Sequence, residues 1–179
     1  MAMEFAHAVV YVQDMDEMVD FYTNILGFTV TDRGPFGPVE GAEILFMSTT
    51  PGHHHQLAFL NTREEVAPSN SVNHLAFRVS DLGSVKAAID ALDADGRATA
   101  MRPVTHGNAW SVYFQDPECN GVEIFCDTPF HVAQPQGRGW DVTMEHDELV
   151  DWTRGEFADE PEFGPIDDFY AAQAERLGS

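Results

Sequence analysis

The fold of this protein is decided by VNHLAFRVSDL (residues 72–82), an apolar run with a histidine near its start and an aspartate near its end. An earlier copy, FAHAVVYVQDM, occupies residues 5–15. The offset is 67 residues (74 − 7), and it persists to the end of the second copy. An internal repeat of this kind indicates two copies of one structural unit. The aligned pairs are His7 with His74, Val12 with Val79, Asp14 with Asp81, Phe46 with Tyr113, and Gln56 with Glu123.

Composition restricts the class of protein. The chain has 179 residues, is 44% hydrophobic and carries a net charge of −21, which suits one compact domain with an appendage. Such a charge repels phosphate backbones, so we expect no nucleic-acid partner. The two cysteines, Cys119 and Cys126, provide no disulfide framework. No signal peptide or membrane-length apolar run is present, so we expect a cytoplasmic protein without a membrane partner.

Each copy has the pattern of a strand, a helix and three strands. In the first copy Asp14, with Glu17 three residues later, predicts a helix start, and Gly27 predicts its end. The second copy repeats the plan from Asp81, with a helix to about Leu92. The predicted strands are 5–12, 28–32, 42–48 and 53–60, then 72–79, 98–102, 110–115 and 122–126.

The predicted fold class is therefore α+β. Two βαβββ modules, residues 4–61 and 72–127, are expected to pair into an open, barrel-like mixed sheet around a metal site. Together they form a domain over residues 1–127, with a C-terminal extension over 128–179.

The C-terminal extension is acidic but rich in aromatic residues. Residues 127–179 carry thirteen acidic and three basic side chains. Packing on the body or on a partner subunit is favoured over the alternative, a solvated acidic tail, by large aromatic side chains, among them Trp140, Trp152, Phe157, Phe163, Phe169 and Tyr170. Short helices are predicted near 145–153 and 165–177. We interpret His131 and His146 as surface residues, and Phe130 as either a pocket-lining or a packing residue.

His7, His74 and Glu123 are the candidate metal ligands. Each histidine lies near the start of the first predicted strand of its module, on the face opposite the small apolar residues. In the last strand, Val122 and Ile124 are apolar, so Glu123 points to the other face. If the modules pack edge to edge, the three side chains converge, and two histidines with one carboxylate are the facial triad of non-haem Fe(II) oxygenases. A single strand histidine would more often be a core residue; the repeat-related pair with a carboxylate reverses that interpretation.

Taken together, these features resemble the vicinal oxygen chelate superfamily, which includes glyoxalase I, fosfomycin and bleomycin resistance proteins and type I extradiol dioxygenases. The resemblance covers residues 4–127. In glyoxalase-like members the equivalent of Gln56 is a fourth ligand, a glutamate. The segment HGNAWSVYFQDP (residues 106–117) followed by Glu123 is similar to the extradiol signature, with Tyr113 ten residues before the ligand. Cys119 departs from that signature, in which the turn carries glycine.

The resemblance also implies catalytic roles. His55, in HHQLAF (residues 54–59), matches the acid/base histidine of these dioxygenases. Strand alternation instead places His54 on the ligand face, and a bulge after Pro51-Gly52 would reconcile the two, so His54 remains the alternative. His106 and Tyr113 would hydrogen-bond the substrate or oxygen; a surface histidine and a core tyrosine are their alternatives.

The implied activity is an extradiol dioxygenase that opens the ring of a catechol or a 2,3-dihydroxybiphenyl-like diol with O₂. The implied cofactor is Fe(II), with Mn(II) as the alternative metal, and a homodimer or higher homo-oligomer is expected. Two other functions stay open: a metal-dependent lyase, isomerase or epimerase of the same superfamily, and a non-catalytic small-molecule-binding resistance protein.

Overall fold

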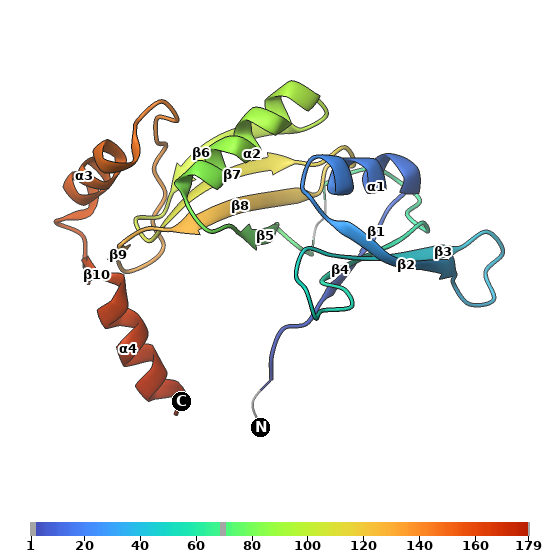
Figure 1. Ribbon diagram of the computed structural model, residues 1–179, viewed down its shortest axis with the longest axis horizontal. Coiled ribbons are helices and arrows are strands. Elements are labelled where there is room, and N and C mark those ends of the chain that lie inside the picture. Colours follow the sequence, from blue (N-terminus) through green and yellow to red (C-terminus); the bar gives the residue numbers. More distant parts are fainter. Residues whose placement is uncertain (1–2, 69–70, 179) are drawn as a thin grey trace.

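The two halves of the chain fold into the same βαβββ unit, as the repeat predicts. A computed structural model describes residues 3–68 and 71–178 (Figure 1). The first module has the sheet order β1-β4-β3-β2 and the second the order β5-β8-β7-β6. The elements of the first are β1 (Ala8–Tyr11), α1 (Met15–Asn24), β2 (Thr29–Pro35), β3 (Glu43–Ser48) and β4 (Leu57–Leu60). Those of the second are β5 (Leu75–Arg78), α2 (Leu82–Asp95), β6 (Thr99–Thr105), β7 (Ala109–Gln115) and β8 (Gly121–Asp127).

Both sheets are mixed and open. β1 runs parallel to β4, and β5 runs parallel to β8, while the remaining pairs are antiparallel. Residues 53–56 lie before β4 instead of inside a strand, which corrects the predicted strand at 53–60. His7 and His74 likewise lie one residue before β1 and β5.

Local sequence signals place the helices. The Asp14 carboxylate accepts a hydrogen bond from the Glu17 amide at 3.0 Å, and Asp81 accepts one from the Ser84 amide at 2.8 Å. These side chains satisfy amides that a first helical turn leaves unpaired. Gly96 ends α2 in the left-handed region at φ 77°, where a side chain would be strained. Both predicted helix starts are confirmed, and α2 extends three residues beyond the predicted Leu92.

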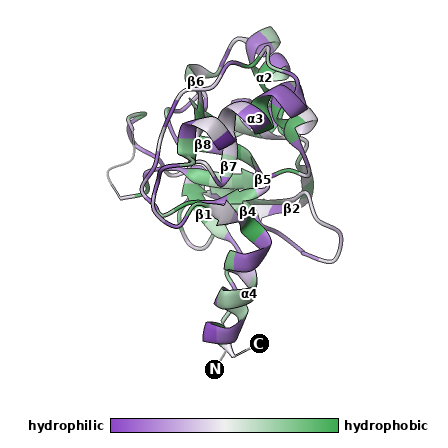
Figure 2. Cartoon of the chain, turned by 90° about the vertical axis from the view of Figure 1, so that its left-hand side faces the viewer, coloured by the Kyte–Doolittle hydropathy of each residue, from purple (hydrophilic) through white to green (hydrophobic). Residues whose placement is uncertain are grey.

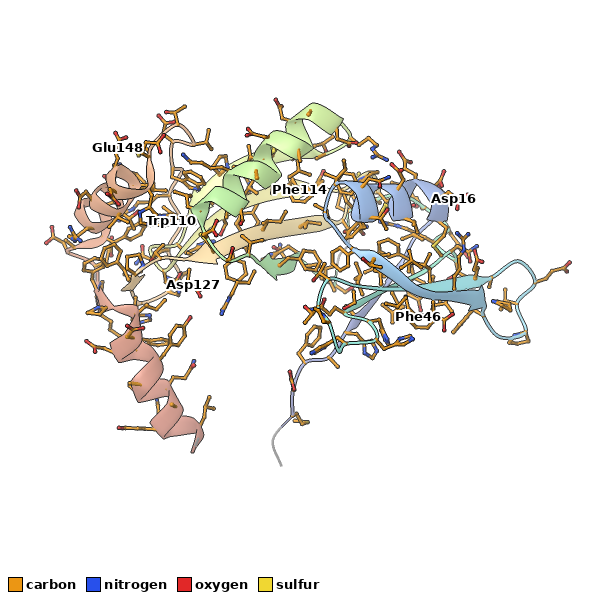
Figure 3. The ribbon with its side chains drawn as sticks, in the orientation of Figure 1. Asp16, Phe46, Trp110, Phe114, Asp127 and Glu148 are labelled. Carbon is orange, nitrogen blue, oxygen red and sulfur yellow. The ribbon has the colours of Figure 1, made fainter. Side chains whose placement is uncertain are left out.

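The helices cover one side of both sheets and leave the other side open (Figure 1). The strands are mostly hydrophobic (Figure 2). One core runs through both modules: the ring centroids of Phe21 and Phe114 are 6.3 Å apart, and those of Phe28 and Phe77 are 5.3 Å apart. Figure 3 shows Phe114 where α1 approaches the second module. The apolar faces of the two units are therefore buried against each other.

A buried carboxylate joins the modules. Glu118, in the turn between β7 and β8, is only 2% exposed. One carboxylate oxygen, Oε1, accepts hydrogen bonds from the backbone amides of Gln13 and Asp14, both at 2.7 Å. The other, Oε2, accepts one from the Arg63 guanidinium at 3.3 Å. Charge-assisted bonds of this kind are about twice as strong as neutral ones. The start of α1 is thus hydrogen-bonded to the turn between β7 and β8 of the second module.

A second polar contact lies beside it. The Tyr22 hydroxyl of α1 donates a hydrogen bond to the Asp116 carboxylate at 3.0 Å, and both side chains are buried. Burial raises the pKa of Asp116, while hydrogen bonds from Asn120 and Tyr22 act in the opposite direction. We refer to Glu118, Asp116, Tyr22, Arg63 and the Gln13–Asp14 backbone as the inter-module clamp.

The C-terminal extension contains β9 (Phe130–His131), α3 (His146–Phe157), β10 (Gly164–Pro165) and α4 (Ile166–Leu177). The part of the extension from β9 to the end of α3 packs on the second module. The Trp110 indole donates a hydrogen bond to the Thr153 hydroxyl of α3 at 2.9 Å, and the Trp140 indole donates one to the Ser111 carbonyl at 3.0 Å. By contrast, α4 buries none of its side chains and projects from the body (Figures 1 and 2).

The structure corrects one prediction for the extension, that of His131, and confirms that of His146. His131 is buried, not on the surface, because its ring stacks on Phe169 at 3.8 Å. His146 is exposed, as predicted, and Phe130 packs against Phe163, with ring centroids 5.1 Å apart. No helix within residues 3–68 and 71–178 is long and apolar enough to cross a membrane.

We predict that Glu118→Gln lowers the free energy of unfolding by about 1–3 kcal/mol, because the amide nitrogen would face a backbone donor and leave buried groups unpaired. Urea denaturation measures the change. The matched control is Glu64→Gln, an exposed side chain, for which the change should stay within about 0.5 kcal/mol. Equal stabilities of the two variants would show that Glu118 does not hold the modules together.

Candidate active site

His74 and Glu123 form the centre of the candidate site. β5 lies beside β8 with Leu75 opposite Val122, so the residue before β5 reaches the side chain of Glu123. The His74 Nε2 atom is 3.2 Å from Glu123 Oε2. The Ser111 hydroxyl donates to the other carboxylate oxygen, Oε1, at 2.6 Å. Glu123 is buried, so this hydrogen bond fixes which oxygen faces His74.

The orientation of His74 suits a metal ligand. Its Nδ1 atom is 2.7 Å from the Asn73 amide oxygen, which can only accept, so Nδ1 carries the proton and Nε2 presents a lone pair. A lone pair and a carboxylate oxygen at 3.2 Å repel unless a proton or a cation lies between them. Two adjacent ligands that are each about 2.1 Å from one cation are themselves about 3 Å apart. The pair therefore fits two positions of a metal site.

His106 and Tyr113 adjoin this pair. Tyr113 lies opposite Glu123 in the β7–β8 ladder. The His106 Nδ1 atom donates to the Gln136 carbonyl at 2.5 Å, so its Nε2 accepts from the Tyr113 hydroxyl at 2.9 Å. Nε2 is also 3.9 Å from Glu123 Oε1. The structure thus brings together four of the predicted site residues, all from the second module.

The charge state of Tyr113 follows from its surroundings. Burial, followed by the adjacent Glu123 carboxylate, raises the pKa of Tyr113 above its ordinary value. Tyr113 therefore remains a neutral phenol and a hydrogen-bond donor near neutral pH. A cavity of about 260 Å³ adjoins the ring, and its lining includes His74, Tyr113 and Arg102. The Arg102 guanidinium lies over the Tyr113 ring, 5.2 Å from its centroid.

Two contacts at this site were missed by the sequence analysis. Ser111 could have been found, because strand alternation in β7 places it on the same face as Tyr113. The Gln136 carbonyl could not, because a backbone oxygen 30 residues away leaves no signal in the pattern of side chains.

The remaining predicted residues form a second cluster, in the first module. The ring centroids of His7 and His55 are 4.3 Å apart, and His55 also contacts Phe46 at 4.9 Å. His54 Nδ1 is 2.9 Å from His55 Nδ1. Figure 3 shows Phe46 on the open side of the first sheet. Partial burial, followed by the charges of His7 and His54, lowers the pKa of His55.

The choice between His54 and His55 does not depend on strand alternation. Both residues precede β4, so the period-2 rule does not apply to them, and no bulge is needed. His55 is the one that contacts His7. Gln56 is engaged elsewhere: its side-chain oxygen accepts from the Ser48 hydroxyl at 3.2 Å and from the Thr49 amide at 3.0 Å.

The predicted convergence of His7, His74 and Glu123 does not occur within one chain. Among the described residues, no group of three or more His, Cys, Asp or Glu side chains is placed to hold a metal ion. The prediction assumed that β1 and β5 pack edge to edge around a common centre. Instead, a cavity of about 470 Å³ is lined by Val9 and Tyr11 of β1 and by Leu75 of β5, and the modules are joined by the inter-module clamp.

The chain is similar in sequence to a family of known proteins and to several of its members. The family model described as "Glyoxalase/Bleomycin resistance protein/Dioxygenase superfamily" matches residues 4–124. The chain is 29% identical over 128 residues to a biphenyl-2,3-diol 1,2-dioxygenase 2 of Rhodococcus globerulus, covering 69% of this chain and 63% of that protein. It is 30% identical over 148 residues to a biphenyl-2,3-diol 1,2-dioxygenase of Metapseudomonas furukawaii, covering 82% of this chain and 46% of that protein. The chain therefore spans only about half to two thirds of these relatives' length.

Solved structures share the fold. A glyoxylase/bleomycin resistance protein/dioxygenase domain from Frankia sp. EAN1pec has a TM-score of 0.60 at 18% identity, covering 72% of this chain and 100% of that one. The fosfomycin resistance protein FosX from Listeria monocytogenes, crystallised with Mn(II) and sulfate, has a TM-score of 0.56 at 18% identity, covering 72% of this chain and 95% of that one.

We predict that Glu123→Gln weakens Mn(II) binding strongly, because it removes an anionic ligand. Ser111→Ala should weaken binding by about 10–100-fold, because the carboxylate loses the hydrogen bond that orients it. Isothermal titration calorimetry with Mn(II) measures both. The control is Glu148→Gln, an exposed α3 carboxylate far from the site (Figure 3), which should bind as the wild type does. Unchanged affinity in Glu123→Gln would remove this residue from the ligand set.

Proposed function

The chain belongs to the glyoxalase/bleomycin resistance protein/dioxygenase superfamily, and from this premise we propose that it is an Fe(II)-dependent extradiol dioxygenase acting on a catechol-type diol. The observation that carries the proposal is the cluster in which His106 and Tyr113 adjoin the His74–Glu123 pair. It combines metal-ligand types with a phenol donor and an imidazole acceptor. The relatives named as biphenyl-diol dioxygenases support the same substrate class.

We assign the metal to His74 and Glu123, with His7 as the third ligand. When bound, Fe(II) would supply the affinity for both diol oxygens and a path for electrons from the diol, which is the reductant, to O₂. Mn(II) is the alternative metal, since these ligand types also bind it. Within one chain only two of these three side chains meet.

Tyr113 and His106 would act on the substrate oxygen. The neutral Tyr113 phenol can turn its hydrogen bond from His106 to a diol oxygen beside Glu123. The Gln136 carbonyl keeps the proton on His106 Nδ1, so Nε2 stays available to accept a hydroxyl proton. Tyr113 and His106 both belong to the second module. His55, which contacts His7, belongs to the first module and would approach the substrate from another side.

His55 would serve as the acid/base residue. It contacts His7, so wherever His7 reaches the metal, the His55 ring comes close to the bound substrate. A neutral imidazole there can take a proton from the second diol hydroxyl and return it later. The four-ligand alternative, a glyoxalase-like lyase or isomerase, fits less well, because Gln56 is hydrogen-bonded to Ser48 and Thr49.

The decisive experiment begins with metal-free protein. Fe(II) is added under anaerobic conditions, followed by catechol, 3-methylcatechol or 2,3-dihydroxybiphenyl, and then air. We expect oxygen uptake together with a yellow ring-opened product for at least one diol. The absence of oxygen uptake across the panel, with Fe(II) bound, would contradict the proposal.

We predict that His55→Ala lowers kcat by about 10²–10⁴-fold, the usual contribution of general acid–base catalysis, while iron remains bound. Steady-state oxygen uptake and iron content measure the two effects. His53→Ala is the matched control, because His53 is exposed and two residues away, and it should keep wild-type turnover. Loss of iron in His55→Ala would give this residue a ligand role instead.

A further inference from the structure

We propose that Arg102 binds an acidic group of the substrate, so that the preferred diol is a catechol whose ring carries a carboxylate side chain. This inference rests on the proposed function and deepens it, since it names the class of diol. The carboxylate would lie in the cavity of about 260 Å³ beside Tyr113, at one end of a row of side chains that leads to Glu123.

The first argument is the place of Arg102 in the second sheet. Arg102 of β6 lies opposite Tyr113 of β7, and Tyr113 lies opposite Glu123 of β8. Residues opposite each other on neighbouring antiparallel strands share one face of the sheet. The three side chains therefore form a row on the face that carries the His74–Glu123 pair. Two strand spacings of about 4.8 Å separate its ends, a distance that an aromatic diol with a short carboxylate side chain can span.

The second argument is the irregular backbone that precedes Arg102. The register of β6 with β7 shifts between Thr99 and Arg102, and Ala100 has a φ of 52°. This is the left-handed region, which is strained for a residue with a side chain. A bulge of this kind bends the strand and changes the direction of the side chain that follows. Ala100 and Arg102 both line the cavity, so the strain lies where the strand presents the arginine to it.

The third argument is that Arg102 has hydrogen-bond donors to spare. A guanidinium has five N–H donors. Arg102 forms no hydrogen bond or ion pair with any of the described residues, and it contacts the face of the Tyr113 ring. The other bases donate to carboxylates or to backbone carbonyls: Arg33, Arg63, Arg78, Lys86, Arg97, Arg138, Arg154 and Arg176. In a chain with 30 acidic side chains, Arg102 is thus placed to receive an anion from outside the chain.

A carboxylate is the anion that suits this arrangement. Its two oxygens match the fork of a guanidinium and accept two parallel hydrogen bonds. The Tyr113 ring covers one face of the Arg102 guanidinium, so the N–H groups at its edge stay available. The net charge of −21 repels anions from most of the surface. Arg102 would therefore also orient the diol, with its carboxylate at β6 and its hydroxyls toward Glu123.

The test compares two diols that differ in charge and hardly in size. The Fe(II)-loaded protein is given 3,4-dihydroxyphenylpropionate or its uncharged amide, and oxygen uptake yields kcat/KM for each. We expect the wild type to prefer the carboxylate by about 10–100-fold, as charge-assisted hydrogen bonds provide, and Arg102→Met to lose this preference. Arg102→Lys keeps the charge without the fork and should retain part of it. The matched control is Arg78→Met, an exposed arginine paired with Asp127, which should keep the wild-type ratio.

A binding measurement separates this inference from the proposed function, because it needs no turnover. Metal-free protein is titrated with 3-phenylpropionate, and the amide NMR shifts of β6 and β7 report binding. We expect affinity that falls in about 0.5 M NaCl, because salt screens the charge. Arg102→Met should bind this probe about tenfold more weakly or worse, since the charge-assisted hydrogen bonds are gone.

Each outcome decides one of the two proposals. Equal kcat/KM for the two diols in the wild type would overturn the inference and leave the proposed function standing. A preference that Arg102→Met leaves unchanged, even where turnover falls, would mean that Arg102 only supports the Tyr113 ring, and would overturn it too. So would equal binding of 3-phenylpropionate by the wild type and Arg102→Met. Binding that requires Arg102, without oxygen uptake for either diol, would support the carboxylate site and contradict the proposed function.

Discussion

The arrangement of this protein depends on the buried carboxylate of Glu118. It accepts hydrogen bonds from two consecutive backbone amides 104 and 105 residues earlier in the chain. Those amides lie where β1 turns into α1, so the carboxylate fixes the start of the first helix against the last turn of the second module. Because the group is buried and fully engaged, the contact resists rotation of one module against the other.

This constraint determines what each module can contribute to chemistry. The second module assembles a nearly complete environment: a histidine and a carboxylate at contact distance, a serine that orients the carboxylate, and a phenol beside it. The first module assembles a histidine pair and an aromatic ring on an exposed, apolar face. The clamp holds these two environments apart.

The C-terminal extension is part of the site as well as a covering layer. Its Gln136 carbonyl fixes the tautomer of His106, and its Trp140 indole binds the backbone of Ser111, which in turn orients Glu123. These residues lie outside the region matched by the family model, which ends at residue 124. The extension therefore supports the hydrogen-bond geometry of a site whose side chains all come from the repeated modules.

The repeated unit, the starts of both helices and the residue types of the site were predictable from the sequence alone. These features are local: strand alternation, an aspartate three residues before a backbone amide, and a histidine at the same place in each copy. Which of these residues meet became visible only in the folded protein. The relation between the modules depends on contacts such as that between Glu118 and Gln13, which join distant parts of the chain and have no periodic signature. For the same physical reason the sequence could identify His7, His74 and Glu123 as a set, whereas the separation of His7 from the other two became visible only in the folded chain.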